Sequence, residues 1–253
     1  MSETKRILAI HAHPDDIEFQ CAGTLLLLKA RGHHVTVATM TPGDKGSAEM
    51  NSLEISSVRR AEAQGAAEIL GADYHCLEFR DLAITYDNAA RRRVTEFLRK
   101  VRPDIILTAP PVDYMADHEI TSKLVRDAAF NASVNNYRTS TLNPAPILAH
   151  MPYLYYVDAT EGVDYYGQRQ IPEFHVDVSS VFETKQKMLA CHASQRNWLL
   201  KQHGIDEYLD ANVRWSTARG AEIGVVHAES FRQHRGHPYP NDNVLLRLLG
   251  LTK

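Results

Sequence analysis

The chain has 253 residues, of which 28 are basic and 31 acidic, so its net charge is −3 when the histidines are neutral. This balance gives no electrostatic basis for binding nucleic acid or an anionic membrane surface, and neither is expected as a partner. No apolar run approaches the ~20 residues of a membrane span, and the first residues do not resemble a signal peptide. The three cysteines, Cys21, Cys76 and Cys191, cannot all pair and lack close metal-binding spacing. We therefore expect a cytoplasmic protein.

A short polar motif follows the first predicted strand. Residues 7–10 are an apolar run typical of a buried strand, and His13-Pro14-Asp15-Asp16 comes soon after it. Pro14 restricts its own φ and keeps His13 out of the helical region, so the turn is stiff and its side chains should converge. Imidazole and carboxylate groups are ordinary ligands of Zn²⁺. Aspartates at a helix start also cap free N–H groups, but the nearby histidine favours chemistry over capping.

The segments that follow alternate between helical and strand patterns. Helices are predicted over 17–31, 53–70, 88–101 and 120–131, and strands over 34–40, 73–79 and 105–108. This order predicts an α/β fold, a Rossmann-like and mostly parallel sheet with helices on both faces. No Gly-x-Gly-x-x-Gly sequence follows the first strand, so a dinucleotide cofactor is not expected.

The regular alternation ends near Ser140. Beyond it, strands are predicted over 147–157 and 174–178, helices over 182–202 and 207–218, and a loop over 233–243. We predict a single domain over residues 1–253, in which a Rossmann-like core, 1–140, is completed by a smaller C-terminal β/α portion, 141–253.

Three loops resemble motifs of the LmbE/PIG-L family of zinc-dependent N-acetylglucosaminyl de-N-acetylases. They are the motif 12–18 followed by Gly-Thr at 23–24, the glycine-bearing loop 41–47, and the loop 109–119. The resemblance implies that His13, Asp16 and His118 bind Zn²⁺ and that Asp15 is the general base. Three protein ligands leave a fourth position for water, which is typical of catalytic zinc sites, and Fe²⁺ or Mn²⁺ could occupy the same ligand set.

The resemblance also implies contacts with a substrate. Arg59 and Asp81 match positions that contact the sugar in the family, and residues 141–253 would form one wall of the cleft. Many family members have an oxyanion-stabilising histidine where this chain has Met115, whose thioether cannot donate a hydrogen bond. We hypothesise that Tyr114 replaces it; the metal alone or a histidine from the later segment are the alternatives.

Three functions are compatible with these residues. The first is a metal-dependent hydrolase that removes the N-acetyl group from an N-acetylglucosaminyl-type small glycoside, with Asp15 activating the attacking water. The second is an amidase that cleaves a larger N-acyl conjugate. The third is a non-catalytic α/β sugar-binding module, for which Met115 is the only support. Some family members form hexamers, so the resemblance allows a homo-oligomer.

Overall fold

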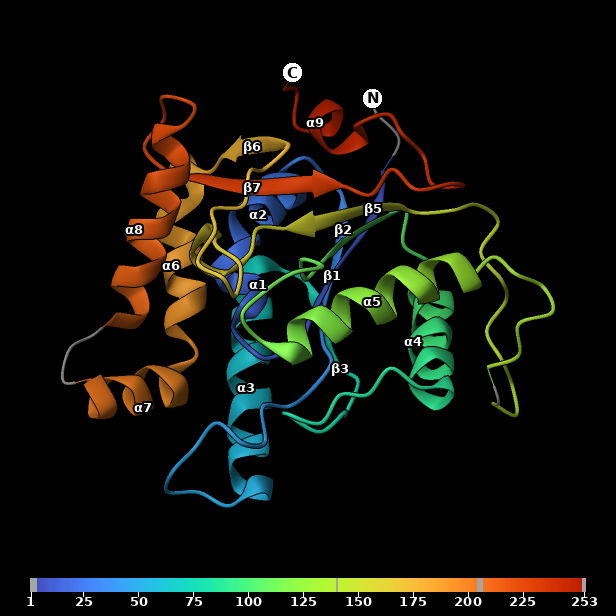
Figure 1. Cartoon of the computed structure of the whole chain (residues 1–253), viewed down its shortest axis with the longest axis horizontal. Coiled ribbons are helices and arrows are strands. Elements are labelled where there is room, and N and C mark those ends of the chain that lie inside the picture. Colours follow the sequence, from blue (N-terminus) through green and yellow to red (C-terminus); the bar gives the residue numbers. More distant parts are fainter. Residues whose placement is uncertain (1–3, 140, 204–206, 252–253) are drawn as a thin grey trace.

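The computed structural model describes residues 4–139, 141–203 and 207–251. At the centre of this part of the chain is a seven-stranded sheet with the strand order β3-β2-β1-β4-β5-β7-β6 (Figure 1). The strands are β1 (Arg6–His11), β2 (His34–Thr39), β3 (Asp73–Cys76), β4 (Ile105–Thr108), β5 (Tyr153–Val157), β6 (Phe174–Asp177) and β7 (Ala228–Gln233). The first five strands pair in parallel, whereas β7 runs antiparallel to both β5 and β6. The predicted α/β fold with a mostly parallel sheet is confirmed.

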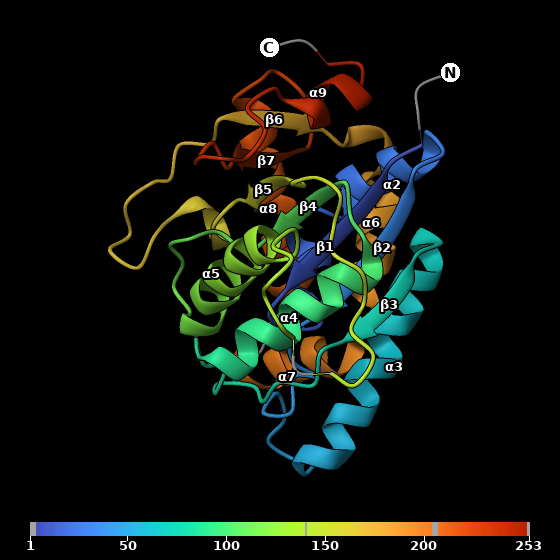
Figure 2. The ribbon, with the colours of Figure 1, turned by 90° about the vertical axis from the view of Figure 1, so that its right-hand side faces the viewer.

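Helices cover both faces of the sheet (Figure 2). They are α1 (Asp16–Gln20), α2 (Ala22–Ala30), α3 (Ser52–Leu70), α4 (Asn88–Val101), α5 (Ala116–Asn131), α6 (Phe182–Ala190), α7 (Ala193–His203), α8 (Glu207–Ala221) and α9 (Val244–Leu248). Helices α4 and α5 pack on the face that carries Leu8 and Ile10, whereas α1, α2, α3 and α6 pack on the face of Ile7 and Ala9. Successive residues of β1 therefore enter two separate cores. Among the described residues, no helix is long and apolar enough to cross a membrane.

Several predicted elements have different bounds in the structure. The predicted helix 17–31 is divided at Cys21, whose φ of −146° is not helical, and the helix 182–202 is divided at residues 191–192. The strand predicted over 147–157 is confined to β5. Strand β7 was not predicted, because buried polar residues such as Glu229 and Gln233 interrupt its apolar pattern. The boundary predicted at Ser140 lies outside the described residues.

A buried ion pair joins β7 and α6 to the start of α2. Lys185 Nζ lies 2.7 Å from Glu229 Oε1, and both side chains are buried. The Glu229 carboxylate also accepts the backbone N–H groups of Gly23 and Thr24, at 2.8 and 2.7 Å. These N–H groups belong to the first turn of α2, which has no internal acceptor for them and favours negative charge. The C-terminal part of the chain is therefore fastened to the segment that follows the His13 turn.

The sheet topology creates a crevice between β1 and β4. Strand β1 is followed on one side by β2 and β3, and the chain then crosses to β4 on the other side. Open α/β sheets bind ligands at such a switch point, outside the carboxyl ends of the strands. The turn after β1 contains His13, and the loop after β4 leads to His118 in the first turn of α5.

Candidate metal centre and active site

The three predicted metal ligands lie together at this switch point. His13 Nδ1 is 3.3 Å from His118 Nε2 and 3.4 Å from Asp16 Oδ2, and His118 Nε2 is 3.4 Å from Asp16 Oδ1. Ligand atoms bound about 2.1 Å from a tetrahedral metal ion are about 3.4 Å apart, so these spacings suit a zinc-sized ion. All three residues are buried. The residues therefore fit the metal that the family resemblance implies.

The second ring nitrogen of each histidine faces a carboxylate. His13 Nε2 is 3.0 Å from Asp81 and 3.3 Å from Asp117, and His118 Nδ1 is 3.2 Å from Asp113. Such partners fix the tautomer of an imidazole and direct its other nitrogen towards a metal ion. His13, Asp81 and Asp117 could themselves group around an ion, but the His13 nitrogen they share is the one that faces away from His118. The structure thus places Asp81, predicted as a sugar contact, against His13.

His11, at the end of β1 and outside the motif 12–18, is a further histidine at the centre. Its Nδ1 lies 2.6 Å from Asp16 Oδ2, and its ring packs edge-on against His118 with the centroids 4.7 Å apart. His11, Asp16 and His118 could therefore also group around an ion. However, the same His11 Nδ1 accepts the N–H of Ala12 at 2.8 Å. Because the lone pair of this nitrogen is directed to the Ala12 N–H, we do not count His11 as the third ligand.

Asp15 directly precedes helix α1 but does not cap it with its side chain. Its backbone has a φ of 98°, in the left-handed region that non-glycine residues rarely adopt, and its side chain makes no capping hydrogen bond. Instead, Oδ2 accepts the hydroxyl of Tyr208 at 2.8 Å and lies 3.7 Å from Arg59 Nη2. Capping therefore does not explain this residue, and a strained backbone at a cleft is typical of a functional one. Nothing in the local sequence of Tyr208 indicated this contact, which comes from packing of α8.

Arg59 and Tyr114 differ in their surroundings. Arg59 is buried and donates from Nη2 to the Pro14 carbonyl at 2.8 Å. A Cβ atom at Gly43 would lie 2.6 Å from the Arg59 guanidinium, so glycine is required where the loop crosses this side chain. Tyr114 is 63% exposed, and its ring lies edge-on to His118 with the centroids 5.4 Å apart. Arg59 thus supports the His13 turn, whereas Tyr114 is free to meet a ligand.

Negative charge dominates the electrostatics of the centre. Burial disfavours the charged form of His118, but Asp16 and Asp113 outweigh burial and raise the pKa of His118 to about 9. Burial also opposes ionisation of Asp16, yet His11 and His118 hold its pKa well below the usual range. Burial raises the pKa of Asp15, and the charge of Arg59 opposes this rise. Several carboxylates thus lie against the histidines of this centre. Their negative charge favours a bound divalent cation.

The cluster opens into a cavity of about 320 Å³. Its walls include the predicted residues of the centre together with Lys45, Met115, Gln195 and Trp198. This volume is at the lower end of the range of small-molecule sites, about 300–1,000 Å³. The cavity thus brings together His13, Asp15, Asp16, Arg59, Asp81, Tyr114 and His118.

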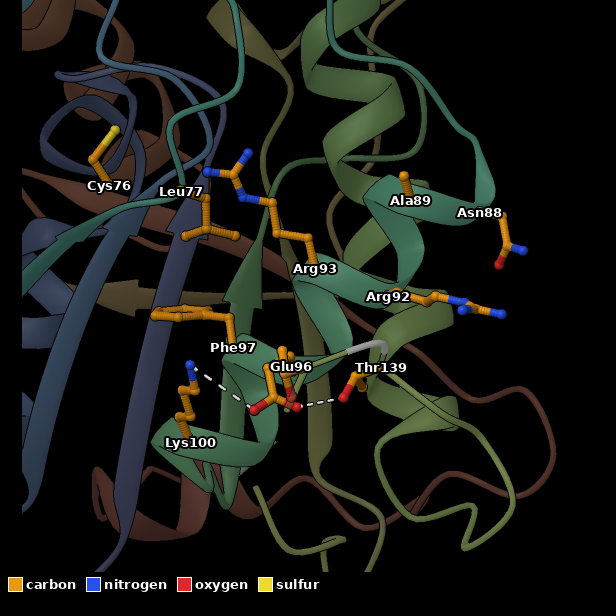
Figure 3. Close-up of a pocket in the computed structure, with 11 residues that line it drawn as sticks. Cys76, Leu77, Asn88, Ala89, Arg92, Arg93, Glu96, Phe97, Lys100 and Thr139 are labelled. Carbon is orange, nitrogen blue, oxygen red and sulfur yellow. Dashed lines mark hydrogen bonds and ion pairs between the residues drawn. The ribbon is translucent and has the colours of Figure 1, made fainter. Parts of the chain in front are cut away.

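A larger cavity, of about 680 Å³, lies beside α4 and the end of β3 and shares none of these residues (Figure 3). Its acidic residue, Glu96, accepts hydrogen bonds from the Thr139 hydroxyl at 2.6 Å and the Ala145 N–H at 2.9 Å. The carboxylate therefore has a structural role in holding the loop after α5. The cluster of ligand-type groups lies in the smaller cavity, and we place the chemistry there.

Comparison with known proteins supports the motif assignment. Residues 8–129 match the family model described as PIG-L, GlcNAc-PI de-N-acetylase. The diacetylchitobiose deacetylase of Thermococcus kodakarensis is 30% identical over 200 residues, covering 77% of this chain and 71% of that protein. The 4-oxalmesaconate hydratase of Pseudomonas putida is 25% identical over 203 residues, covering 76% and 75%.

A solved structure resembles the whole fold as well. The N,N'-diacetylchitobiose deacetylase from Pyrococcus horikoshii superposes with a TM-score of 0.76 at 25% identity, covering 94% of this chain and 88% of that one. The relatives thus include deacetylases of N-acetylglucosamine-type substrates, which agrees with the predicted class of reaction. The chain belongs to the LmbE/PIG-L family, as its three motif loops predicted.

Proposed function

We propose that this protein is a zinc-dependent hydrolase that removes the acetyl group from an N-acetylglucosaminyl-type small glycoside. The proposal rests mainly on the three residues His13, Asp16 and His118, whose ligand atoms lie 3.3–3.4 Å apart. They line a cavity whose wall also includes Asp15. The activities named for the deacetylase relatives support the same class of substrate.

The metal ligands and Asp15 have different roles in the proposed amide hydrolysis. A divalent metal held by the trio would supply Lewis-acid polarisation of the acyl carbonyl and would lower the pKa of a water molecule. Asp15 takes the proton of the attacking water and delivers it to the leaving amine nitrogen as the C–N bond breaks, which releases acetate. Tyr208 occupies Asp15 Oδ2, so the other carboxylate oxygen remains for this proton. Burial raises the pKa of Asp15, which makes its carboxylate a stronger base.

Tyr114 is proposed to donate a hydrogen bond to the oxyanion in place of the histidine that Met115 replaces. Its ring lies beside His118 and lines the cavity. We expect Tyr114→Phe to lower kcat about tenfold or more with little change in KM, because the donor acts mainly in the transition state. Steady-state kinetics would measure this effect. An unaltered kcat would contradict this role of Tyr114 and leave the metal alone or a histidine from the later segment to stabilise the oxyanion.

The ligand assignment predicts the metal content of variants. His13→Ala and His118→Ala should each lose bound zinc, because two ligands do not retain the ion as three do. Elemental analysis of purified protein would show about one zinc per chain in the wild type and far less in these variants. His150→Ala is a matched control, since His150 is exposed and lies beside Asp104 at the surface. Full zinc occupancy in both ligand variants would contradict the assignment.

Acetate release tests the proposed reaction. The zinc-loaded protein should release acetate from N-acetylglucosamine or its simple glycosides, measured by an enzyme-coupled acetate assay. A panel of larger N-acyl conjugates in the same assay separates a deacetylase from an amidase of broader substrate size. No release from any acetylated sugar would overturn the proposal.

A hydratase is the second candidate. It is favoured by the similarity to 4-oxalmesaconate hydratase and by Lys45 and Arg59 in the cavity, since cationic side chains suit a carboxylate-bearing substrate. A metal-activated water and a carboxylate base would serve this reaction as well. Loss of ultraviolet absorbance from an unsaturated polycarboxylate, without acetate release from any sugar, would favour this candidate.

A further inference from the structure

The cavity of about 680 Å³ beside α4 has no part in the proposed reaction, and we call it the α4 cavity. It lies outside the catalytic cavity, with which it shares no lining residue. Its volume is near the middle of the range of small-molecule sites, about 300–1,000 Å³. The α4 cavity is therefore large enough to hold a ligand of its own.

The outer face of α4 forms one wall of this cavity. Residues four apart lie on the same face of a helix. Two such rows of α4 line the cavity: Asn88, Arg92, Glu96 and Lys100 form one, and Ala89, Arg93 and Phe97 form the other. The opposite face of the helix, with Val94 and Leu98, is buried in the core. Cys76 and Leu77 also line the cavity, which thus lies between the outer face of α4 and the end of β3.

Apolar side chains form part of the lining. Leu77 is buried, and the half-buried Phe97 packs against the core on the α4 side of the sheet. The Phe97 ring lies edge-on to the ring of His75, with the centroids 5.5 Å apart. Removal of apolar surface from water is favourable. An apolar ligand body placed against Leu77 and Phe97 would therefore be stabilised.

The charged side chains of the lining are mostly cationic. Three basic residues, Arg92, Arg93 and Lys100, line the cavity together with one acidic residue, Glu96. The carboxylate of Glu96 already accepts hydrogen bonds from Thr139 and from the backbone of the loop after α5. This local excess of positive charge contrasts with the net charge of −3 of the whole chain. The charge of the lining is complementary to an anion.

Arg93 and Lys100 have few contacts that neutralise their charge. Arg93 lies over the Phe79 ring, 4.9 Å from its centroid, and its Nη1 is 3.5 Å from the Glu78 carbonyl oxygen. Lys100 Nζ is 3.9 Å from Glu96, but the Lys100 side chain is 63% exposed, and such pairs contribute little. Both cations can therefore turn to an anionic group at low cost.

Phe97 lies between these two cations on the helix. It follows Arg93 by four residues and precedes Lys100 by three, so all three belong to one face of α4. Figure 3 shows their side chains projecting from α4 towards the side on which Leu77 lies. An apolar surface flanked by two cations suits a ligand that has an apolar body and a negatively charged group.

We propose that the α4 cavity binds a small anion, a carboxylate carried on an aliphatic chain or an aromatic ring. The apolar body lies against Leu77 and Phe97, and the carboxylate accepts charge-assisted hydrogen bonds from Arg93 or Lys100. This second binding site is separate from the catalytic cavity and does not depend on the proposed deacetylation.

Calorimetry of the zinc-loaded protein with octanoate and with 2-naphthoate tests the site. Excess acetate in the buffer occupies any carboxylate position at the metal but lacks an apolar body. One molecule of at least one acid should bind per chain, and the uncharged analogues 1-octanol and 2-naphthol should bind far more weakly. Tighter binding of octanoate would assign an aliphatic body to the ligand, and tighter binding of 2-naphthoate an aromatic one.

Charge-reversal variants locate the bound anion. Arg93→Glu and Lys100→Glu should each raise Kd about tenfold or more, because attraction is replaced by repulsion. Lys187→Glu makes the same change on the exposed surface of α6, on the opposite face of the sheet, and should leave Kd unchanged. Arg93 and Lys100 are exposed, so these variants should fold, which circular dichroism would check.

Three results would overturn the proposal. The first is the absence of binding of either acid. The second is binding of the uncharged analogues as tight as that of the acids. The third is a Kd that is the same in Arg93→Glu, Lys100→Glu and the wild type, because the acid would then bind elsewhere. None of these results bears on acetate release, so the proposed deacetylase would stand or fall separately.

Discussion

Replacing Asp15 by asparagine should lower kcat for acetate release by roughly 10²–10⁴-fold while the protein keeps its zinc. Asparagine has the same shape but cannot accept the proton of the attacking water. It also tolerates the left-handed backbone at this position, where φ is 98°, better than alanine does. Asp15 is not one of the three proposed metal ligands, so zinc binding should persist. Steady-state kinetics and elemental analysis of one preparation would measure both quantities.

The control for this variant is Asp210→Asn, which makes the same chemical change on the exposed surface of α8. It should leave both kcat and zinc content as in the wild type. A kcat for Asp15→Asn within tenfold of the wild-type value would contradict the general-base assignment. Loss of zinc from Asp15→Asn would instead place this carboxylate among the ligands.

Glu229→Ala should lower the free energy of unfolding by about 3–5 kcal/mol, the size expected when one partner of a buried ion pair is removed. The variant leaves the Lys185 ammonium buried without its carboxylate. It also leaves the N–H groups of Gly23 and Thr24 without their acceptor at the start of α2. Urea denaturation followed by circular dichroism would measure the change as a lower midpoint with a similar slope.

An exposed ion pair supplies the comparison for Glu229. Lys187→Ala removes the partner of Glu183 on the surface of α6, and it should change the urea midpoint little because exposed pairs contribute little. Lys185→Met combined with Glu229→Gln should be less harmful than Glu229→Ala, since it removes the buried charge and keeps an acceptor for α2. An unchanged midpoint in Glu229→Ala would show that this pair does not fasten the C-terminal part.

The proposed ligands could be identified from sequence because each belongs to a short motif next to a predicted strand. His13 and Asp16 follow β1, and His118 follows β4, so a parallel sheet brings them to the same edge although 105 positions separate the two histidines. The contact that orients the proposed base, Asp15, could not be predicted in this way. Tyr208 reaches Asp15 only through the packing of α8, which no local pattern records.

Two features of the fold show why sequence patterns were incomplete. Strand β7 contains Glu229, which is polar but buried. Its carboxylate accepts hydrogen bonds from an N–H group of α2 and from the ammonium of Lys185. The apolar alternation of β7 is therefore interrupted, and the strand could not be predicted from that alternation. Helical periodicity continued through Cys191 and His192, but His192 is buried 3.3 Å from Glu18, and the chain turns there. Long-range contacts thus overrode the local pattern.

The most direct test of the account is a zinc titration of the metal-free protein while acetate release from N,N'-diacetylchitobiose is measured. The account predicts no release before zinc is added, a linear rise in rate up to one zinc per chain, and no rise in His118→Ala. Release that is unaffected by a chelator, or that rises equally in His118→Ala, would contradict catalysis at the centre formed by His13, Asp16 and His118.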